Sequence, residues 1–470
     1  MHGDFLQAAA AAVPAFVVYG LTCGRDVTGE DSGELITAAY TLGIAHPPGY
    51  PLWCLLAKGC SLLVPLGSVA FRVALLSSFL GALTVGGVYL ILRTLSLSAA
   101  VSLVGSWALA FSLDFWSQCV IAEVYTLNTA LLSLVLLFLL QWHRAHEDRH
   151  LLAFAFVFGL GLANHTTMLA LGPIFALFVL ASEWRVLLRW RTLRAMLLLV
   201  LPGLSIYLYL PLRSAADPPM DWGNPETWRG FLAHVTREQY RFAITDTPRS
   251  LGLTLRQVVA WCGIFLEQFT PWLVPVILLG AWRHLRAERK GGLLLAAVFA
   301  AGGAGIMVLL NTRLEREPLT AYRSFYLPAY VAAAVWLGLG LELLTRWMSA
   351  IAPRRPWPRG ASSMAILAVP ATLLWLHYVP NQRRDYPFAR DYATNLAATM
   401  KRDAIFFPSS DHATFPLVYL QLVEGLRPDV TIGGKYGYPD ATLVWDRIVE
   451  RGDRPVYFSK KRSLPPGHVW

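Results

Sequence analysis

The chain has 470 residues, of which 55% are hydrophobic and only 15% charged, and its mean hydropathy is +0.47. Water-soluble proteins carry about 25% charged residues, so the composition excludes a disordered chain, a coiled coil and a small secreted disulfide scaffold. It indicates a protein mostly embedded in a membrane. The net charge of +10 does not indicate nucleic-acid binding, because the basic residues gather in short breaks between apolar runs, as on the cytoplasmic side of membrane proteins.

Apolar segments recur along most of the chain. A membrane-spanning helix needs about 20 mainly apolar residues, and 98–113 and 151–164 are short for a span. We predict about eleven spans: 5–23, 69–92, 98–113, 121–142, 151–164, 166–182, 195–212, 257–282, 291–311, 325–346 and 360–379.

The breaks between these segments predict the orientation. If the N-terminus is cytoplasmic, every break that faces inward is basic, from Arg93 through the 185–194 and 283–290 clusters to Arg359. This agrees with the positive-inside rule. No A-x-A-like cleavage site follows the first apolar run before Asp31, so we expect an uncleaved first span.

The segments that face outward are of another kind. Residues 24–68 and 213–256 form long polar loops, and from about 380 to 470 the composition is that of a soluble domain. Stretches 404–407 and 455–458 predict short strands. The expected fold is therefore an all-α polytopic membrane domain, 1–379, followed by a small α/β extracytoplasmic tail, 380–470.

The first outward loop carries the most unusual polar residues. Asp31 and Glu34 are three residues apart, so they share one face if a helix begins at Ser32. A helix cap explains Ser32 equally well, but it explains the two acids less well. His46 follows in the run His-Pro-Pro-Gly-Tyr-Pro, where the prolines fix the backbone and the glycine admits a turn. Such a turn suits either a site or a re-entrant bend.

Further polar residues stand at the outward ends of the predicted spans. An ionisable or amide group there faces a cavity or bonds to a neighbouring helix, a lone histidine at a helix join is more often structural, and an outward arginine binds either a phosphate or ordinary lipid headgroups. The candidate substrate-binding residues are Glu123, Tyr125, Asn164, His165, Arg213, Asp221, Trp222, Arg237, Arg313 and Arg323.

The chain has no Walker motif and no GxGxxG or GxSxG, so chemistry on soluble nucleotides lacks support. Carboxylates, guanidinium groups and aromatic rings at an outward face suit a sugar carried on a lipid phosphate. Cations stabilise the departing phosphate, and a carboxylate deprotonates the acceptor.

An ordered series of motifs resembles the DUF2723 family. It runs from Asp31-Ser-Gly-Glu-Leu and His46-Pro-Pro-Gly-Tyr-Pro-Leu through Glu123-Val-Tyr-Thr-Leu and Asn164-His-Thr to Tyr322-Arg-Ser-Phe-Tyr. Leu210-Pro-Leu-Arg, Asp217-Pro and Asp221-Trp-Gly lie between them. The match is good over roughly 25–330 and looser in the tail, through Arg427-Pro-Asp-Val.

That family resembles the GT-C glycosyltransferases, and its animal relatives are protein O-mannosyltransferases of the plexin/IPT-domain type. The resemblance implies a polyprenyl- or dolichyl-phosphate sugar as donor, inversion at the anomeric carbon, no cofactor and no essential metal. Asp31 matches the acidic residue expected to serve as base, and we place Glu34 and His46 with it as candidate catalytic residues.

The leading hypothesis is thus an integral membrane glycosyltransferase in a bacterial inner membrane or its equivalent. It moves a hexose, mannose first, from the lipid phosphate to an extracytoplasmic hydroxyl on a protein or a glycan. A polytopic transporter or lipid-linked-sugar flippase is the alternative, although no repeat is found and the polar motifs cluster at one face rather than at the midplane. A non-catalytic sensor with the tail as its ligand-binding domain is a third reading, against which the acids of the first loop argue.

Overall fold

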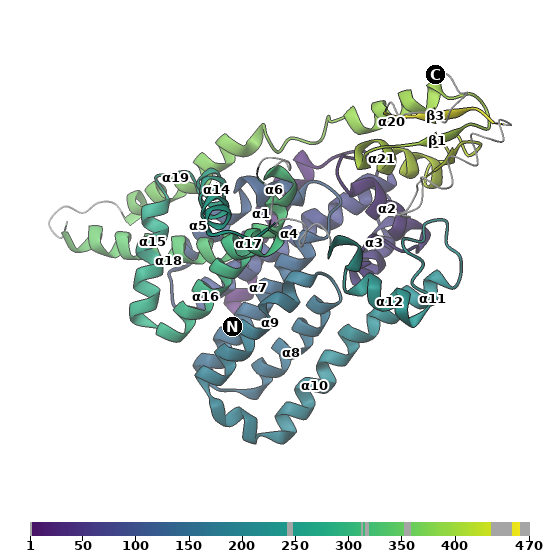
Figure 1. The fold of residues 1–470 in the computed structure, drawn as a ribbon. Coiled ribbons are helices and arrows are strands. Elements are labelled where there is room, and N and C mark those ends of the chain that lie inside the picture. The colour runs from purple at the N-terminus through teal and green to yellow at the C-terminus, as the bar shows by residue number, and fades with distance from the viewer. Residues whose placement is uncertain are drawn as a thin grey trace.

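A computed structural model describes residues 2–241, 248–311, 314, 319–351, 359–433 and 454–460. Most of them are helical (Figure 1). The α-helices are α1 His2–Thr22, α2 Ser32–Thr41, α3 Pro51–Leu63, α4 Val69–Thr94, α5 Ala99–Ala110, α6 Leu113–Cys119, α7 Tyr125–Ala145, α8 Asp148–Leu162, α9 Thr166–Ser182, α10 Trp190–Ser205, α11 Tyr209–Ser214, α12 Trp228–Val235, α14 Leu251–Phe269, α15 Val274–Ala287, α16 Arg289–Ala300, α17 Ile306–Leu310, α18 Leu327–Ile351, α19 Arg359–Tyr378, α20 Phe388–Thr399 and α21 Asp411–Leu422.

Shorter elements join these helices. Four are 3₁₀-helices and one, η4, is a π-helix within the span that α16 begins. Their bounds are η1 Trp184–Leu188, η2 Ile206–Leu208, η3 Glu238–Tyr240, η4 Ala301–Gly305 and η5 Leu319–Tyr326, and the strands are β1 Ile405–Phe407, β2 Thr431–Ile432 and β3 Val456–Phe458.

Each of the eleven predicted spans falls on a helix or a run of helices. Within the described part of the chain, six helices are long and apolar enough to cross a membrane, or eight if each of two bent pairs is one span, and α9 is among the shorter apolar helices. The six are Gly3–Thr22, Val69–Thr94, Tyr125–Ala145, Trp190–Ser214, Arg289–Leu310 and Tyr322–Ala350. The prediction of an integral membrane protein is confirmed.

The span predicted over 257–282 is not one continuous helix, because it lies on two helices, α14 and α15, that meet at 102°. The cause is local. Pro271 disfavours helical backbone at Thr270, which has φ 64°, and a second proline stands in the first turn of α15, where proline is tolerated. The shorter break between α5 and α6 bends the chain by 73°.

Small residues let helices of the bundle approach closely. A Cβ on Gly203 of α10 would lie 2.1 Å from the backbone of Gly159 in α8, so the two backbones are in direct contact, as at many membrane helix crossings. The opposite face of α10 exposes Leu197, Leu198 and Leu201. An exposed leucine face on a helix of this length fits contact with lipid chains.

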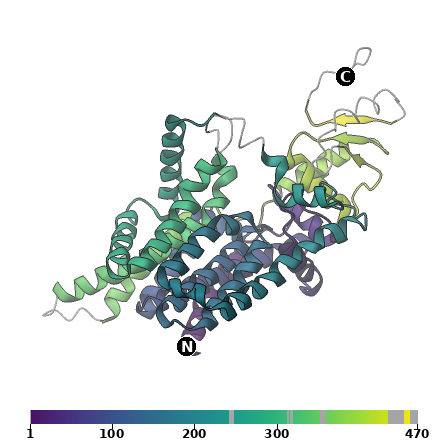
Figure 2. The same cartoon turned by 60° about the horizontal axis from the view of Figure 1, so that its bottom comes forward.

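The C-terminal segment forms a small α/β unit at one end of the bundle (Figures 1 and 2). Its three parallel strands have the order β2-β1-β3, which confirms the strands predicted over 404–407 and 455–458. The two-residue β2 was not predicted, since it is too short to give an alternating pattern.

Helix α21 of this unit packs against α2 of the first outward loop. The contact requires a glycine, because a Cβ on Gly33 would lie 2.5 Å from the carbonyl oxygen of Phe415. Gly33 stands between Asp31 and Glu34, so the C-terminal unit is docked on the turn that carries the predicted catalytic acids.

Candidate active site

The first outward loop folds back on itself and joins His46 to Glu34. The backbone N–H of His46 donates to Glu34 Oε1 at 2.8 Å, and His46 Nδ1 lies 2.9 Å from Glu34 Oε2. Glu34 is completely buried and His46 is 9% exposed. The loop can close this way because Gly49 takes φ 91° and its N–H donates to the His46 carbonyl at 2.8 Å, after which Pro51 starts α3. The predicted grouping of Glu34 with His46 is present.

Asp31 stands at the exposed edge of this pair. Its Oδ2 lies 3.9 Å from His46 Nε2, and its side chain is 39% exposed. Although Asp31 occupies the N-cap position of α2, its carboxylate makes no capping hydrogen bond, and the Ser32 hydroxyl is bonded to the backbone of Ala122. The acid is therefore available to a ligand, while His46 Nε2 is shared with the hydroxyl of Tyr50 at 3.0 Å.

Burial and like charges raise the pKa of the acids around Asp31. Burial raises the pKa of Glu34 above its usual range, although the charge of His46 opposes it. Burial and the Asp31 charge raise the pKa of Glu30, and burial with the charges of Asp31 and Glu30 raises the pKa of Glu123 well above its usual range. Strongly perturbed carboxylates in one place are typical of functional sites.

The stability difference between the wild-type chain and His46→Gln is expected to shrink as pH rises above about 6.5, the ordinary pKa of histidine. Burial lowers the pKa of His46, but the charges of Glu34 and Asp31 outweigh it, so the folded-state pKa is raised. A group whose pKa is raised on folding stabilises fully below its unfolded pKa, and this contribution is lost as pH rises through the folded pKa. Melting temperatures in detergent from about pH 6 to about pH 9 test this, and a difference that grows with pH contradicts it.

Aromatic rings enclose the far side of His46. Tyr50 stacks on His165 with 6.0 Å between ring centroids, and Tyr125 lies 5.4 Å from the same imidazole. His165 also caps α9, since its Nδ1 accepts from the Thr167 N–H, and burial lowers the pKa of His165 well below its usual range. A neutral, capping histidine is the structural role expected of it, although its Nε2 is buried with no hydrogen-bond partner among the described residues.

Two predicted residues hold the loops in register. Trp222 lies 5.9 Å from His46, ring to ring, and the backbone N–H of Trp222 donates to the carbonyl of Ile44 at 3.2 Å. Asp221 pairs with Ile44 in an isolated parallel bridge, and its carboxylate accepts from the Ser214 hydroxyl at 2.9 Å. Trp222 is thus part of the site, whereas Asp221 binds the second outward loop to the first.

Asn164 and Glu123 are buried at the junction behind the site. The Asn164 side-chain N–H donates to the carbonyl of Val124 at 3.2 Å, and its oxygen has no partner in the described structure. Glu123 is 2% exposed, and its backbone carbonyl accepts from the indole of Trp53 at 3.1 Å. The Asn164 amide thus bonds to the backbone of Val124, the residue that precedes α7.

The four predicted arginines differ in their surroundings. Arg237 has φ 58°, and its guanidinium lies over the ring of Tyr240 at 4.9 Å. Its charge interacts electrostatically with His46 and Tyr50. Among the described residues, no carboxylate forms an ion pair with it. Arg213 Nε donates to the carbonyl of Leu42 at the end of α2. Arg323 bonds to Asp114 and Glu267, and Arg313 lies outside the described residues. Arg237 is the cation best placed to bind an anion beside His46.

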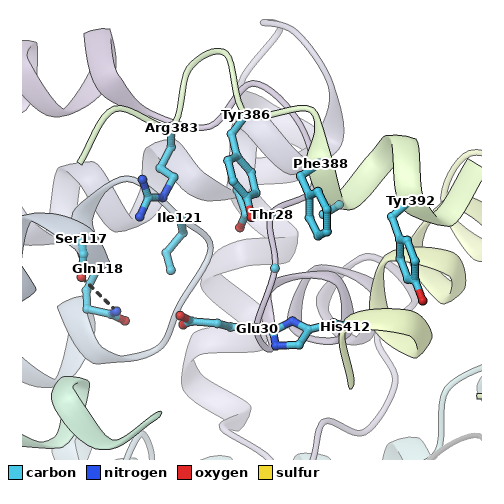
Figure 3. Close-up of a pocket in the computed structure, with 12 residues that line it drawn as sticks. Thr28, Glu30, Ser117, Gln118, Ile121, Arg383, Tyr386, Phe388, Tyr392 and His412 are labelled. Carbon is cyan, nitrogen blue, oxygen red and sulfur yellow. Dashed lines mark hydrogen bonds between the residues drawn. The ribbon is translucent and has the colours of Figure 1, made fainter. Parts of the chain in front are cut away.

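A cavity of about 620 Å³ opens at Glu30, the residue before Asp31, between the first loop and the C-terminal unit (Figure 3). Glu30 and His412 lie on one side of it, and Arg383 and Tyr386 on the other. Among the described residues, no group of three or more His, Cys, Asp and Glu side chains is arranged to hold a metal ion.

Some residues of the site were not predicted from the sequence. Tyr50 lies four positions after His46 in the same motif, and Glu30 directly precedes Asp31, so both could have been predicted from their positions in the sequence. Asp411 and His412 were not, because only the docking of α21 brings them to Asp31 and Glu30. The nearby sequence Ser-Asp-His-Ala signals an ordinary helix start.

Residues 31–188 match the model of the Protein O-mannosyl-transferase TMEM260 N-terminal domain, and residues 389–435 match TMEM260-associated domain 2. A mouse Protein O-mannosyl-transferase TMEM260 is 31% identical over 92% of this chain and 65% of its own length. A Dictyostelium discoideum protein of the same name is 24% identical over 88% of this chain and 55% of its own. The chain thus spans between about half and two thirds of these relatives.

The solved structure of ArnT from Cupriavidus metallidurans, bound to undecaprenyl phosphate, aligns with 96% of this chain and 89% of its own at a TM-score of 0.60 and 15% identity. The apo form aligns at 0.57. The chain has a GT-C-like fold. The fold class predicted from the sequence, with its small α/β tail, is confirmed. The domain boundary near 380 and the assigned residue roles stay predictions.

Proposed function

We propose that this chain is an integral membrane glycosyltransferase that moves a hexose, mannose first, from a polyprenyl- or dolichyl-phosphate donor to an extracytoplasmic hydroxyl with inversion. The observation that carries the proposal is the placement of Asp31, an exposed carboxylate beside a buried His46–Glu34 pair. The mannosyltransferase names of the two relatives and the undecaprenyl phosphate bound by ArnT support the reaction class and the donor class.

The proposed reaction is a single displacement. Asp31 takes the proton of the acceptor hydroxyl as its oxygen attacks C1 of the sugar, the bond from C1 to the phosphate oxygen breaks, and the polyprenyl phosphate leaves with the electron pair. General-base assistance contributes about 10²–10⁴-fold. Arg237 neutralises the leaving phosphate, because charge-assisted donors placed where charge develops stabilise the transition state. His46, held by Glu34, positions Asp31.

The proposed location places the site outside the cytoplasm and the N-terminus inside it. The basic inward breaks of the sequence support this orientation. The partners are then the membrane lipid, the lipid-linked sugar and an acceptor that carries a hydroxyl on a protein or a glycan.

Offering different donors in parallel to the purified protein in detergent tests the proposal. Radiolabelled polyprenyl-phosphate mannose, polyprenyl-phosphate glucose and GDP-mannose are compared, and release of sugar from a lipid-linked donor alone is expected, as slow hydrolysis when no acceptor is present. Turnover of GDP-mannose, or movement of intact lipid-linked sugar across liposomes without cleavage, contradicts the proposal and favours a soluble-donor enzyme or a flippase.

Arg237→Gln is expected to raise the KM for the lipid-linked donor about 10- to 100-fold, since a hydrogen bond to a charged group contributes about 1.5–3 kcal/mol. Arg229→Gln is the matched control, because Arg229 is exposed on the same outward segment. Initial rates against donor concentration measure the effect. Equal KM values for the two variants would contradict the assignment of Arg237 as the residue that binds the donor phosphate.

A further inference from the structure

The cavity beside Glu30 is built from two parts of the chain far apart in sequence. The first outward loop and the end of α6, with His412 beside Glu30, supply one wall, and residues 383–392 supply the other (Figure 3). At about 620 Å³ it is within the range of about 300–1,000 Å³ that small-ligand sites occupy. Its size admits a short piece of a larger molecule.

Two buried polar atoms in residues lining this cavity lack hydrogen-bond partners within the described structure. They are Thr28 Oγ1, in a residue 5% exposed, and Gln118 Oε1, in a residue 7% exposed. The Gln118 amide is oriented by its own N–H, which donates to the Ser117 hydroxyl at 3.3 Å and leaves the oxygen free (Figure 3). Buried polar groups are nearly always hydrogen-bonded, so these atoms indicate a ligand that brings hydrogen-bonding groups to them.

Aromatic side chains form the wall contributed by the C-terminal unit. Phe388 and Tyr392 lie nearly parallel, with 7° between their planes and 6.0 Å between centroids, and Tyr386 lies 6.3 Å from Phe388. Phe388 is 62% exposed. Exposed rings rimmed by polar groups commonly mark a binding surface.

Asp31 connects this cavity to the group around His46, because it directly follows Glu30, which lines the cavity, and its Oδ2 lies 3.9 Å from His46 Nε2. The Asp31 carboxylate interacts electrostatically with Glu30 and Asp411. It also interacts with Tyr50 and Tyr240, which are in reach of the Arg237 charge. Inversion requires the attacking hydroxyl and the departing phosphate on opposite faces of the sugar ring. If the phosphate is bound at Arg237, the hydroxyl arrives from the cavity.

We propose that this cavity binds the acceptor as an extended polypeptide segment, with Gln118 and Thr28 hydrogen-bonded to its backbone, the aromatic wall against its side chains, and a Ser or Thr hydroxyl delivered to Asp31. This inference rests on the proposed function and adds the acceptor site to it. A backbone N–H suits the free Gln118 oxygen, and alternating side chains of an extended segment suit a wall of flat rings.

Separate assays of acceptor transfer and donor hydrolysis test this assignment. The probe is a pool of synthetic octapeptides with one central threonine, offered with radiolabelled polyprenyl-phosphate mannose. A Phe388→Ala/Tyr392→Ala double variant and Gln118→Leu are each expected to raise the KM for the peptide pool by about tenfold or more. Hydrolysis of the donor without peptide is expected to stay within about twofold of the wild-type rate.

Trp228→Ala is the control, because Trp228 is a 73% exposed aromatic residue on the outward α12, and neither rate is expected to change. A parallel fall in hydrolysis and peptide transfer overturns the inference by assigning the cavity to the donor. Unchanged peptide transfer, or labelling of an oligosaccharide pool in place of the peptides, overturns it as well. Wild-type protein that hydrolyses no lipid-linked donor overturns the proposed function itself.

Discussion

Asp31→Asn is expected to abolish sugar transfer while leaving the fold intact. The substitution keeps the size of the side chain and removes its basicity. Because the Asp31 carboxylate is 39% exposed and makes no capping bond, the folded chain loses little. Loss of a general base costs about 10²–10⁴-fold in rate. Donor turnover and thermal unfolding of the same purified preparation measure the two effects together.

Asp385→Asn provides the control, since Asp385 is an exposed aspartate of the C-terminal segment and is not among the residues that line the cavity. Its turnover is expected to equal that of the wild type. Near-normal turnover by a folded Asp31→Asn protein contradicts the assignment of Asp31 as the base. An Asp31→Asn protein that does not fold contradicts the inference that Asp31 is not required for folding.

Glu34→Ala is expected to give the largest loss of stability, about 3–5 kcal/mol, the usual cost of removing one partner from a buried charge pair. Glu34 is completely buried and bonds to both the backbone N–H and the ring of His46. Without it, His46 is left buried and the loop between α2 and α3 loses its closure. Denaturant unfolding in detergent measures the difference.

A double-mutant cycle measures the interaction energy between Glu34 and His46 separately from the contacts that each makes with other residues. Glu34→Ala/His46→Ala is expected to cost less than the two single changes added together, by about 0.5–3 kcal/mol. Exact additivity shows that the two side chains do not interact in solution and contradicts the buried pair. Glu226→Gln, an exposed acid of the second outward loop, should leave stability within about 0.5 kcal/mol of the wild type.

The local features of the site were accessible from the sequence. The three-residue spacing of Asp31 and Glu34 and the proline-rich turn after His46 are local, and the helix and turn that they predict are present. Glu34 and His46, which contact each other, are only twelve positions apart in the chain, so their contact closes a local loop. Strand signals in the tail were equally local and equally reliable.

The tertiary features were not accessible. Whether 257–282 is one helix or two depends on whether Thr270 and Pro271 break the helix, which an apolar window does not register. Arg213, Arg237 and Arg323 share a residue type and a predicted outward position. In the described structure, however, Arg213 bonds to a carbonyl, Arg237 has no carboxylate partner and Arg323 forms ion pairs. Contacts between segments far apart in sequence decide these differences. The same kind of contact, with α20 and α21, forms the cavity.

The anomeric configuration of the product tests the central claim most directly. A donor of one defined configuration is offered with an acceptor hydroxyl, and the new glycosidic bond is assigned by NMR. With Asp31 acting as a base, a single displacement inverts C1, so the product is expected to have the opposite configuration to the donor. Retention of configuration would require a covalent sugar–enzyme intermediate and would contradict the account.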